Sequence, residues 1–251
     1  MSLFDMFKKS KAPENHSGNA LQKQLAQFPY PCEILPAGLT REALTQLWLK
    51  ACDEGRREGF TPILLTEPDQ LEDFLEEIGN GSDFVAKTLA ASEKINVRTF
   101  FGHQMENLTD GDDEYDPFEE LGEMENGTRS DHFISYDAAE QDTVILVKVP
   151  TTRPWEAVIY LPFGGWNECP YPEEIAAVLH DWHEKYGAVP ALMTHDILEV
   201  YVPSPIPTEQ AMEPAKEQYL FCCDIVEQGV GTIGALADCL RQSKMWYFWW
   251  D

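Results

Sequence analysis

The sequence predicts an α/β or α+β fold, with a mixed β-sheet and helices packed on its faces. In the first third of the chain, apolar runs of strand length alternate with segments whose apolar residues recur at helical spacing. From residue 142 onward, strand-like and helical segments alternate again. The 251 residues suffice for one large domain or two small ones, and in either case for a buried core.

The N-terminal part divides into a flexible tail, residues 1–22, and an α/β half, residues 23–105. The tail contains turn-forming residues such as Pro13 and Gly18. In the half that follows, Thr40 suits the N-cap of a helix. The elements expected there are a strand at Pro31–Leu35, a helix from Thr40 to about Gly55–Gly59, a strand at Phe60–Thr66 and a helix from Pro68–Asp69 to about Gly79–Gly81.

Residues 106–131 are expected to form an acidic loop. They hold eleven acidic residues against one basic residue, Arg129, and few apolar ones. Such a run is typical of solvated loops. Loose cation binding is the alternative, although Tyr115 stands where a calcium loop of the EF-hand type needs glycine.

The C-terminal part, residues 132–251, is expected to be a second α/β module. Pro172 suits the first position of a helix, and Gly187 suits its end. The aromatic run Trp246–Trp250 is apolar on both faces, which predicts a strand that is central or covered. The expected elements are a hairpin of Val144–Val149 and Ala157–Pro162, a helix from Pro172 to about Gly187, strands at Val189–Met193 and Ile197–Val202, a long helix from Thr208 to about Gln228, a helix from Thr232 to about Ser243 and a strand at Trp246–Trp250.

A weak internal repeat relates the two halves. Leu35–Pro36, a helix and Phe60–Leu64 resemble Leu161–Pro162, a helix and Ala188–Leu192. A duplicated strand–helix–strand unit would explain the likeness, and chance similarity of two such units is the simpler explanation. Whether the halves form one domain or two stays open.

A formal net charge of −26 limits the classes of function. A surface this negative repels phosphate and opposes docking onto anionic lipid, so we expect no nucleic-acid ligand. No apolar run is long enough to span a membrane. The six cysteines are too sparse for a disulfide scaffold and lack C-x-x-C spacing, and the N-terminus lacks the order of a signal peptide. We therefore expect a reduced, cytoplasmic protein with no metal or cofactor.

The most unusual stretch runs from Gly164 to Pro170, between an expected strand and an expected helix. Ligands of α/β proteins favour that position. Nearby glutamates disfavour a phosphate, so we interpret the stretch as a contact site for another ligand or partner, or as a structural turn. The terminal aromatics are a ligand platform or a core strand. The contact candidates are Gly164, Gly165, Trp166, Asn167, Trp249, Trp250 and Asp251.

Catalysis has four candidate residues, Cys169, His195, Glu217 and Asp224. Cys169 would be a nucleophile and His195 its base. A helix N-terminus lowers a thiol pKa, whereas the local glutamates raise it. Glu217 and Asp224 lie about 10 Å apart along the expected helix, too far to share a proton, so we expect them to be solvated or bonded to Trp and Tyr donors.

Taken together, these motifs resemble a bacterial family known as a domain of unknown function, over residues 142–251. The resemblance implies a bacterial cytosolic protein and marks the motif positions as site candidates, but it implies no activity. The motifs that carry it are Gly164-Gly165-Trp166-Asn167 with Cys169-Pro170, Trp182, Tyr186-Gly187-Ala188, Glu217-Gln218-Tyr219, Asp224 and Trp249-Trp250-Asp251.

The acidic charge and the lack of a strong catalytic constellation predict a non-catalytic binding or inhibitor protein, comparable to an immunity protein, for a basic protein partner. The alternative is a hydrolase-like enzyme for small molecules, with its pocket between the Gly164–Cys169 loop and the Trp-rich C-terminus. A metal-dependent regulator is a third hypothesis. The sequence identifies neither a substrate nor an oligomeric state.

Overall fold

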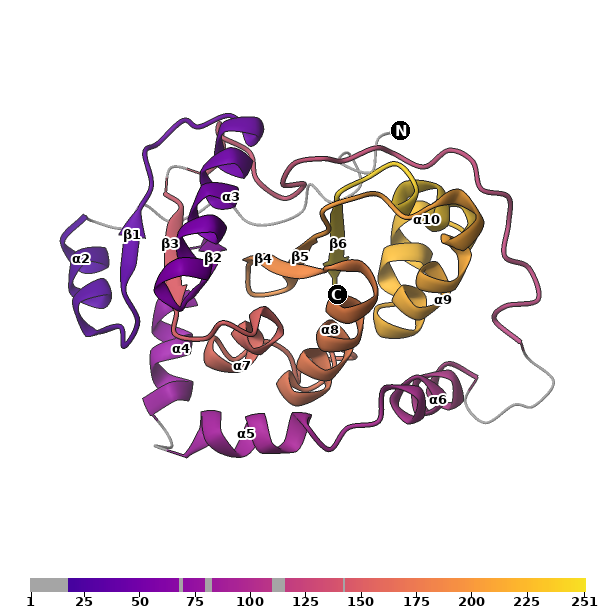
Figure 1. The fold of residues 1–251 in the computed structure, drawn as a ribbon, viewed down its shortest axis with the longest axis horizontal. Coiled ribbons are helices and arrows are strands. Elements are labelled where there is room, and N and C mark those ends of the chain that lie inside the picture. The colour runs from indigo at the N-terminus through magenta and orange to yellow at the C-terminus, as the bar shows by residue number, and fades with distance from the viewer. Residues whose placement is uncertain (1–17, 68–69, 80–82, 110–115, 142) are drawn as a thin grey trace.

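The computed structural model describes residues 18–67, 70–79, 83–109, 116–141 and 143–251 (Figure 1). Its helices are α2 (Gly18–Gln27), α3 (Arg41–Glu58), α4 (Gln70–Gly79), α5 (Phe84–Ser92), α6 (Val97–Leu108), α7 (Ala157–Tyr160), α8 (Pro172–Tyr186), α9 (Met212–Phe221) and α10 (Ile233–Leu240). Its strands are β1 (Cys32–Ile34), β2 (Thr61–Leu65), β3 (Ile145–Val149), β4 (Val189–Met193), β5 (Ile197–Tyr201) and β6 (Met245–Trp249). Shorter turns are η1 (Pro154–Glu156), η2 (Thr208–Gln210) and the π-helical η3 (Ile225–Val230).

Within the described residues, the strands form one six-stranded sheet in the order β1-β3-β2-β4-β5-β6. β2 and β4 are parallel, and every other neighbouring pair is antiparallel. The predicted mixed sheet is therefore confirmed. β3 belongs to the C-terminal module yet lies between β1 and β2, so both halves of the chain build the same sheet.

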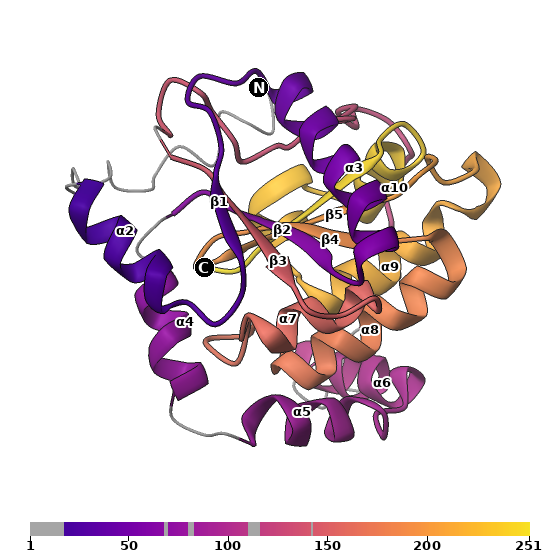
Figure 2. The ribbon, with the colours of Figure 1, turned by 60° about the vertical axis from the view of Figure 1, so that its left-hand side comes forward.

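Helices cover both faces of this sheet (Figure 2). On one face, Leu44 and Trp48 of α3 pack with Leu64 of β2. On the other, α7, α8 and α9 pack with Ile63 and Leu65. Neighbouring residues of a strand point to opposite faces, which is why β2 contributes to both cores. α5 and α6 form an outer layer against α7, α8 and α9.

Trp182 joins three elements in the larger core. Its fully buried ring stacks on Phe248 of β6 with 5.6 Å between centroids. It also meets Phe221 and Trp246 edge to face. The indole N–H donates to Glu217 Oε2 at 2.8 Å, so this ring links α8, α9 and β6.

The capping residues behave as expected from the sequence. The hydroxyls of Thr40 and Thr232 accept from backbone N–H groups of the helices that they precede. Gly59 and Gly187 end α3 and α8 in the left-handed conformation, with φ of 88° and 69°. Pro172 stands in the first turn of α8.

The hairpin expected at 144–149 and 157–162 is wrong in its second strand. β3 forms, but Ala157–Tyr160 is the helix α7, preceded by η1. Both edges of β3 are already paired, with β1 and with β2, so no edge is left for a hairpin partner. Ala157, Val158 and Ile159 are buried all the same, because a short helical turn inside the core buries an apolar run as well as a strand does.

The long helix expected from Thr208 to Gln228 is interrupted. α9 ends at Phe221, and Cys222 is extended, with φ −155° and ψ 90°. The chain then re-enters a helical form as η3. The Cys222 thiol donates to the carbonyl of Trp249 at 3.0 Å, so the break brings the chain against the end of β6.

Other expectations differ in part. Residues 18–22 belong to α2 rather than to a tail, and α5 and α6 were not predicted. The second unit of the internal repeat lacks its first strand, because α7 occupies that place. The expected tail at 1–17, helix start at 68–69, helix stop at 80–81 and loop residues 110–115 lie outside the described residues.

The acidic loop predicted at 106–131 begins later than expected, because residues 106–108 belong to α6. Residues 116–131 have no helix or strand and are bonded to α10. The carbonyl of Leu121 accepts from Gly234 N at 2.6 Å, and the backbone N–H of Gly127 donates to Asp238 Oδ2 at 2.7 Å. This loop therefore covers α10 on its way to β3.

Glu199 of β5 is a fully buried acid that fixes the segment before β3. Its carboxylate accepts from the backbone N–H groups of Ile134 and Ser135 and from the Ser135 hydroxyl. Burial raises the pKa of this carboxyl to about 7, although the hydrogen bonds from Ser135 and Ile134 act in the opposite direction. The folded protein thus retains a proton that an unfolded chain releases at an ordinary carboxyl pKa.

We expect Glu199→Gln to remove part of the pH dependence of stability. Between the unfolded carboxyl pKa and about 7, the folded state binds the extra proton, so wild-type stability falls as pH rises, by up to about 3 kcal/mol. Urea unfolding at several pH values between about 4 and about 8 measures this slope, because that range spans the ordinary and the raised carboxyl pKa. Glu33→Gln, at an exposed position of β1, is the control. Parallel curves for wild type and Glu199→Gln would contradict the assignment.

Candidate functional site

The sequence-predicted site residues gather where β2, β4 and β6 end. β2 and β4 are parallel, and β6 runs the same way because β5 is antiparallel to both β4 and β6. Their carboxyl ends therefore lie at one edge of the sheet, which is where α/β folds commonly place ligand sites. We call this region the motif end and define it as residues 66–67, 164–171, 194–196, 222–224 and 249–251.

A tight loop at 164–171 forms one wall of the motif end. Gly164 and Gly165 have positive φ, 106° and 84°. The backbone N–H of Gly165 donates to the carbonyls of Cys169 and Pro170. A Cβ on Gly164 would lie 2.2 Å from the carbonyl oxygen of Pro170, so only glycine fits there.

Asn167 connects this loop to the last residues of the chain. Asn167 is itself left-handed, with φ of 46°, and its amide donates to the carbonyl of Asp251 at 2.7 Å. The N–H of Asp251 donates to Asp224 Oδ2 at 3.2 Å. A longer contact of 3.6 Å joins the Cys223 thiol to Glu168. The loop, the break after α9 and the C-terminal residues are thus bonded together.

Asp196 performs the same role for the turn between β4 and β5. One carboxylate oxygen accepts from the Thr194 hydroxyl, and the other accepts from the indole N–H of Trp249 at 2.9 Å. Its carbonyl accepts from the N–H of Trp250. This residue therefore sets the position of the C-terminal tryptophans.

His195 lies between two carboxylates. Its Nδ1 is 2.7 Å from Glu67 Oε2, and its Nε2 is 3.5 Å from Asp196 Oδ2. The hydrogen bond to Glu67 raises the pKa of His195, with a smaller contribution from the charges of Glu67 and Asp196, while burial opposes the rise. The imidazole is therefore held toward its protonated form.

Carboxylates outnumber cations at the motif end. Beside His195, the region carries Glu67, Glu168, Asp196, Asp224 and Asp251. Among the described residues, His195 is the one basic side chain that forms an ion pair with these carboxylates, namely those of Glu67 and Asp196. Tyr171 adds an aromatic surface, because 61% of it is exposed at the start of α8.

A family model matches the part of the chain that contains the motif end, except for residues 66–67. Residues 145–251 match the model of a family described as a domain of unknown function, DUF4253. The C-terminal part of this chain is therefore similar to the DUF4253 family. No curated protein and no solved structure matches the chain. The matched region begins with β3, so α2 to α6, β1 and β2 precede it.

Cys169 of the matched region lacks the surroundings of an activated nucleophile. Its side chain is buried, and burial raises the pKa of the thiol, which the hydrogen bond from Gly165 only partly offsets. Among the described residues, no hydrogen bond joins this thiol to His195. The structure thus keeps Cys169 protonated and assigns His195 to carboxylates instead.

Glu217 lies away from the motif end. Its carboxylate accepts from the indole of Trp182 and from Lys185, both at 2.8 Å, which confirms the expected bond to a Trp donor. Trp182 lies about 16 Å along α8 from the loop, given the rise of 1.5 Å per residue. Asp224 does belong to the motif end, so the two acids serve different regions.

The aromatic candidates are partly structural. Trp166 and Trp250 both pack against Phe163, with ring centroids 5.0 and 5.8 Å away. Trp250 is 3% exposed and Trp166 is half-buried. The C-terminal run is therefore mainly a core strand with its end held at the motif end, rather than an open platform.

The two histidines of α8, His180 and His183, both contact the ring of Trp155. Trp155 stacks on His180 at 4.1 Å and lies 5.0 Å from His183. Within the part of the chain that the structure describes, no group of three or more His, Cys, Asp or Glu residues is arranged to hold a metal ion. Within the same residues, no helix is long and apolar enough to cross a membrane.

Sequence reasoning missed Glu67 and Tyr171. Glu67 directly follows a buried strand, and the rule that sites form at carboxyl ends of parallel strands would have identified it once β2 and β4 were known to be neighbours. Tyr171 follows Cys169-Pro170, and only the structure shows that its ring lies outside the core.

We expect Gly164→Ala to destabilise the protein by about 3 kcal/mol or more, because it combines positive φ with a backbone clash. Gly38→Ala is the matched control: φ there is 71°, but no atom lies near the added Cβ. That change should cost only about 1–2 kcal/mol. Urea unfolding measures the stability of both variants. Equal losses of stability would show that the loop can move to relieve the backbone clash at residue 164.

We expect NMR titration to give His195 a midpoint above its ordinary pKa, and Glu67→Gln to lower that midpoint. A raised histidine pKa stabilises the fold below the unfolded value of about 6.5 and loses this effect as pH rises through the folded value. The stability difference between wild type and Glu67→Gln should accordingly shrink at high pH. Glu33→Gln is the control, and an unchanged His195 midpoint in Glu67→Gln would disprove the pairing.

Proposed function

We propose that this protein is a non-catalytic binding protein, of the inhibitor or immunity type, and that its motif end contacts a basic protein. The observation that carries the proposal is the exposed ring of Tyr171 beside a group of carboxylates that His195 alone balances among the described residues. Tyrosine is enriched among residues that dominate binding energy, and charge complementarity speeds association.

The chemistry of the motif end supports binding more than catalysis. The Cys169 thiol is buried, and His195 is held by Glu67 and Asp196. The rigid loop and the hydrogen bonds of Asn167 and Asp196 hold the surface in one shape, and a preorganised surface loses little entropy on association.

A bacterial cytoplasm is the setting that we propose. All six cysteines are free, as suits a reducing compartment. The net charge of −26 disfavours nucleic acid as the partner and favours a cationic protein surface.

The test is affinity capture from native bacterial lysate with the full chain as bait. We expect a stoichiometric basic protein that dissociates when salt rises from about 0.1 M to about 1 M, because the Debye length falls from about 10 Å to about 3 Å. The partner's affinity is then measured with purified proteins. A partner that is acidic, or one whose affinity does not depend on salt, would contradict the proposal.

Two pairs of variants locate the contact face. Tyr171→Ala should weaken the partner's affinity at least about tenfold. Ile34→Ala should not, although Ile34 on β1 is the other exposed large apolar residue among those the structure describes. Glu168→Gln with Asp251→Asn should slow association, whereas Glu33→Gln with Glu58→Gln changes the net charge equally at other exposed positions. Equal effects of both charge pairs would mean that total charge, not the motif end, drives binding.

A further inference from the structure

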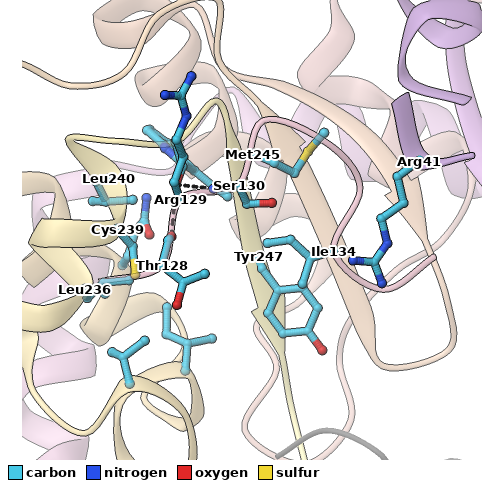
Figure 3. A pocket seen from close by; sticks show the side chains of 15 residues that line it. Arg41, Thr128, Arg129, Ser130, Ile134, Leu236, Cys239, Leu240, Met245 and Tyr247 are labelled. Carbon is cyan, nitrogen blue, oxygen red and sulfur yellow. Dashed lines mark hydrogen bonds between the residues drawn. The ribbon is translucent and has the colours of Figure 1, made fainter. Parts of the chain in front are cut away.

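A cavity of about 140 Å³ lies beside β6, the strand at the edge of the sheet (Figure 3). Its walls come from β6, α9, η3, α10 and the segment 128–134. None of its lining residues belongs to the motif end. It is therefore a feature separate from the proposed contact face.

Two residues that line this cavity each carry a buried hydrogen-bond donor that has no partner among the described residues. The donors are Nε2 of Gln218 and Nε1 of Trp246, and each residue is 1% exposed. A buried donor that makes no hydrogen bond destabilises the fold, so a ligand that supplies an acceptor is favoured there. Gln218 lies in the Glu217-Gln218-Tyr219 motif, so the cavity accounts for a motif residue that the motif end does not use.

The rest of the wall is mainly apolar, and the two arginines among its lining residues are bonded to other groups. Ile225, Leu236 and Leu240 supply aliphatic surface. Arg129 is bonded to Asp131 at 2.6 Å, and its side chain is 68% exposed; it points away from Tyr247 in Figure 3. Arg41 donates from Nε to the carbonyl of Tyr136.

The electrostatics of this wall disfavour an anion. Tyr247 lines the cavity and lies opposite the buried Glu199 in the strand pairing. Its phenol pKa is raised first by burial and then by the charge of Glu199. A second negative charge in the cavity would add to that repulsion.

We propose that this cavity binds a compact neutral molecule whose carbonyl oxygen accepts from Gln218 Nε2 and Trp246 Nε1. Cavities of roughly 150 Å³ hold benzene, so the ligand has about six non-hydrogen atoms. A carbonyl oxygen has two lone pairs and accepts two N–H donors at once. The aliphatic wall takes the apolar body of the ligand. A ketone, aldehyde or small amide has the required chemistry.

The experiment uses cyclopentanone and its isostere methylenecyclopentane, in which a CH₂ group replaces the oxygen. The indole N–H of Trp246 in ¹H–¹⁵N spectra of the full chain is the reporter, and Trp246→Phe assigns it. We expect a saturable downfield shift with cyclopentanone at millimolar concentrations, as its size allows. Isobutyrate, an anion with the same number of non-hydrogen atoms, should not bind.

Gln218→Met tests the second donor with little change of volume. This substitution should weaken the binding of cyclopentanone about fivefold relative to the binding of methylenecyclopentane, because only the ketone accepts from the lost N–H. Gln228→Met, at an exposed glutamine bonded to Asp224, is the control and should leave both affinities unchanged.

Three results would overturn the proposal. One is no saturable shift of the Trp246 signal with cyclopentanone up to about 20 mM, well above the affinity expected at this size. Another is an equal effect of Gln218→Met on both probes. The third is binding of isobutyrate in preference to the ketone. The first comparison needs only the wild-type protein, so it stands even if Gln218→Met fails to fold.

Discussion

The aromatic strand β6 must be shielded from water on both faces and along its outer edge. The side chains on both faces of β6 are apolar, yet β6 is the last strand of the sheet. An open edge of this composition would be an aggregation hazard. The structure covers one face with α8 and α9, through Trp182 and Phe221, and it bonds the 133–136 segment to neighbouring β5 through Glu199. Along the outer edge lie α10 and the segment around Ser130, whose carbonyl accepts from Met245 N.

The motif end and the cavity are both consequences of covering this strand. At its carboxyl end, Asp196, Asp224 and Asn167 bond to residues 249–251 and fix the position of the tryptophans. Near its beginning, the covering elements leave a cavity lined by Gln218 and Trp246, each of which has a buried donor without a partner among the described residues. The same strand thus supplies an acidic surface at one end and a small neutral cavity toward the other.

Most of the acidic residues that the structure describes lie outside the core. Several of the described basic residues form ion pairs with carboxylates, as Lys185 does with Asp181 and Glu217. Three acids are buried among the described residues: Glu156 and Asp238 pair with Arg153 and Arg241, whereas burial raises the pKa of Glu199. A protein with this surface associates most readily with cationic partners, and its neutral cavity suits a ligand that carries no charge.

Sequence by itself determined the local features of this protein. Helix starts at Thr40, Pro172 and Thr232 and helix ends at Gly59 and Gly187 follow from short-range chemistry, because a cap depends only on residues within one turn. The mixed sheet and the motif loop were predicted on the same basis. For Glu217 the sequence left two alternatives, solvent or a Trp or Tyr donor, and the structure shows Trp182 as the donor.

Only the tertiary structure decided which strands are neighbours, and the remaining features depend on that choice. The pairing of β3 with both β1 and β2 made Ala157–Tyr160 helical, and the parallel pairing of β2 with β4 placed Glu67 beside His195. The break at Cys222, the exposure of Tyr171 and the unpaired donors of Gln218 and Trp246 likewise arise from contacts between distant segments. A sequence pattern reports what each segment prefers alone, whereas these contacts depend on how all segments fill one core together.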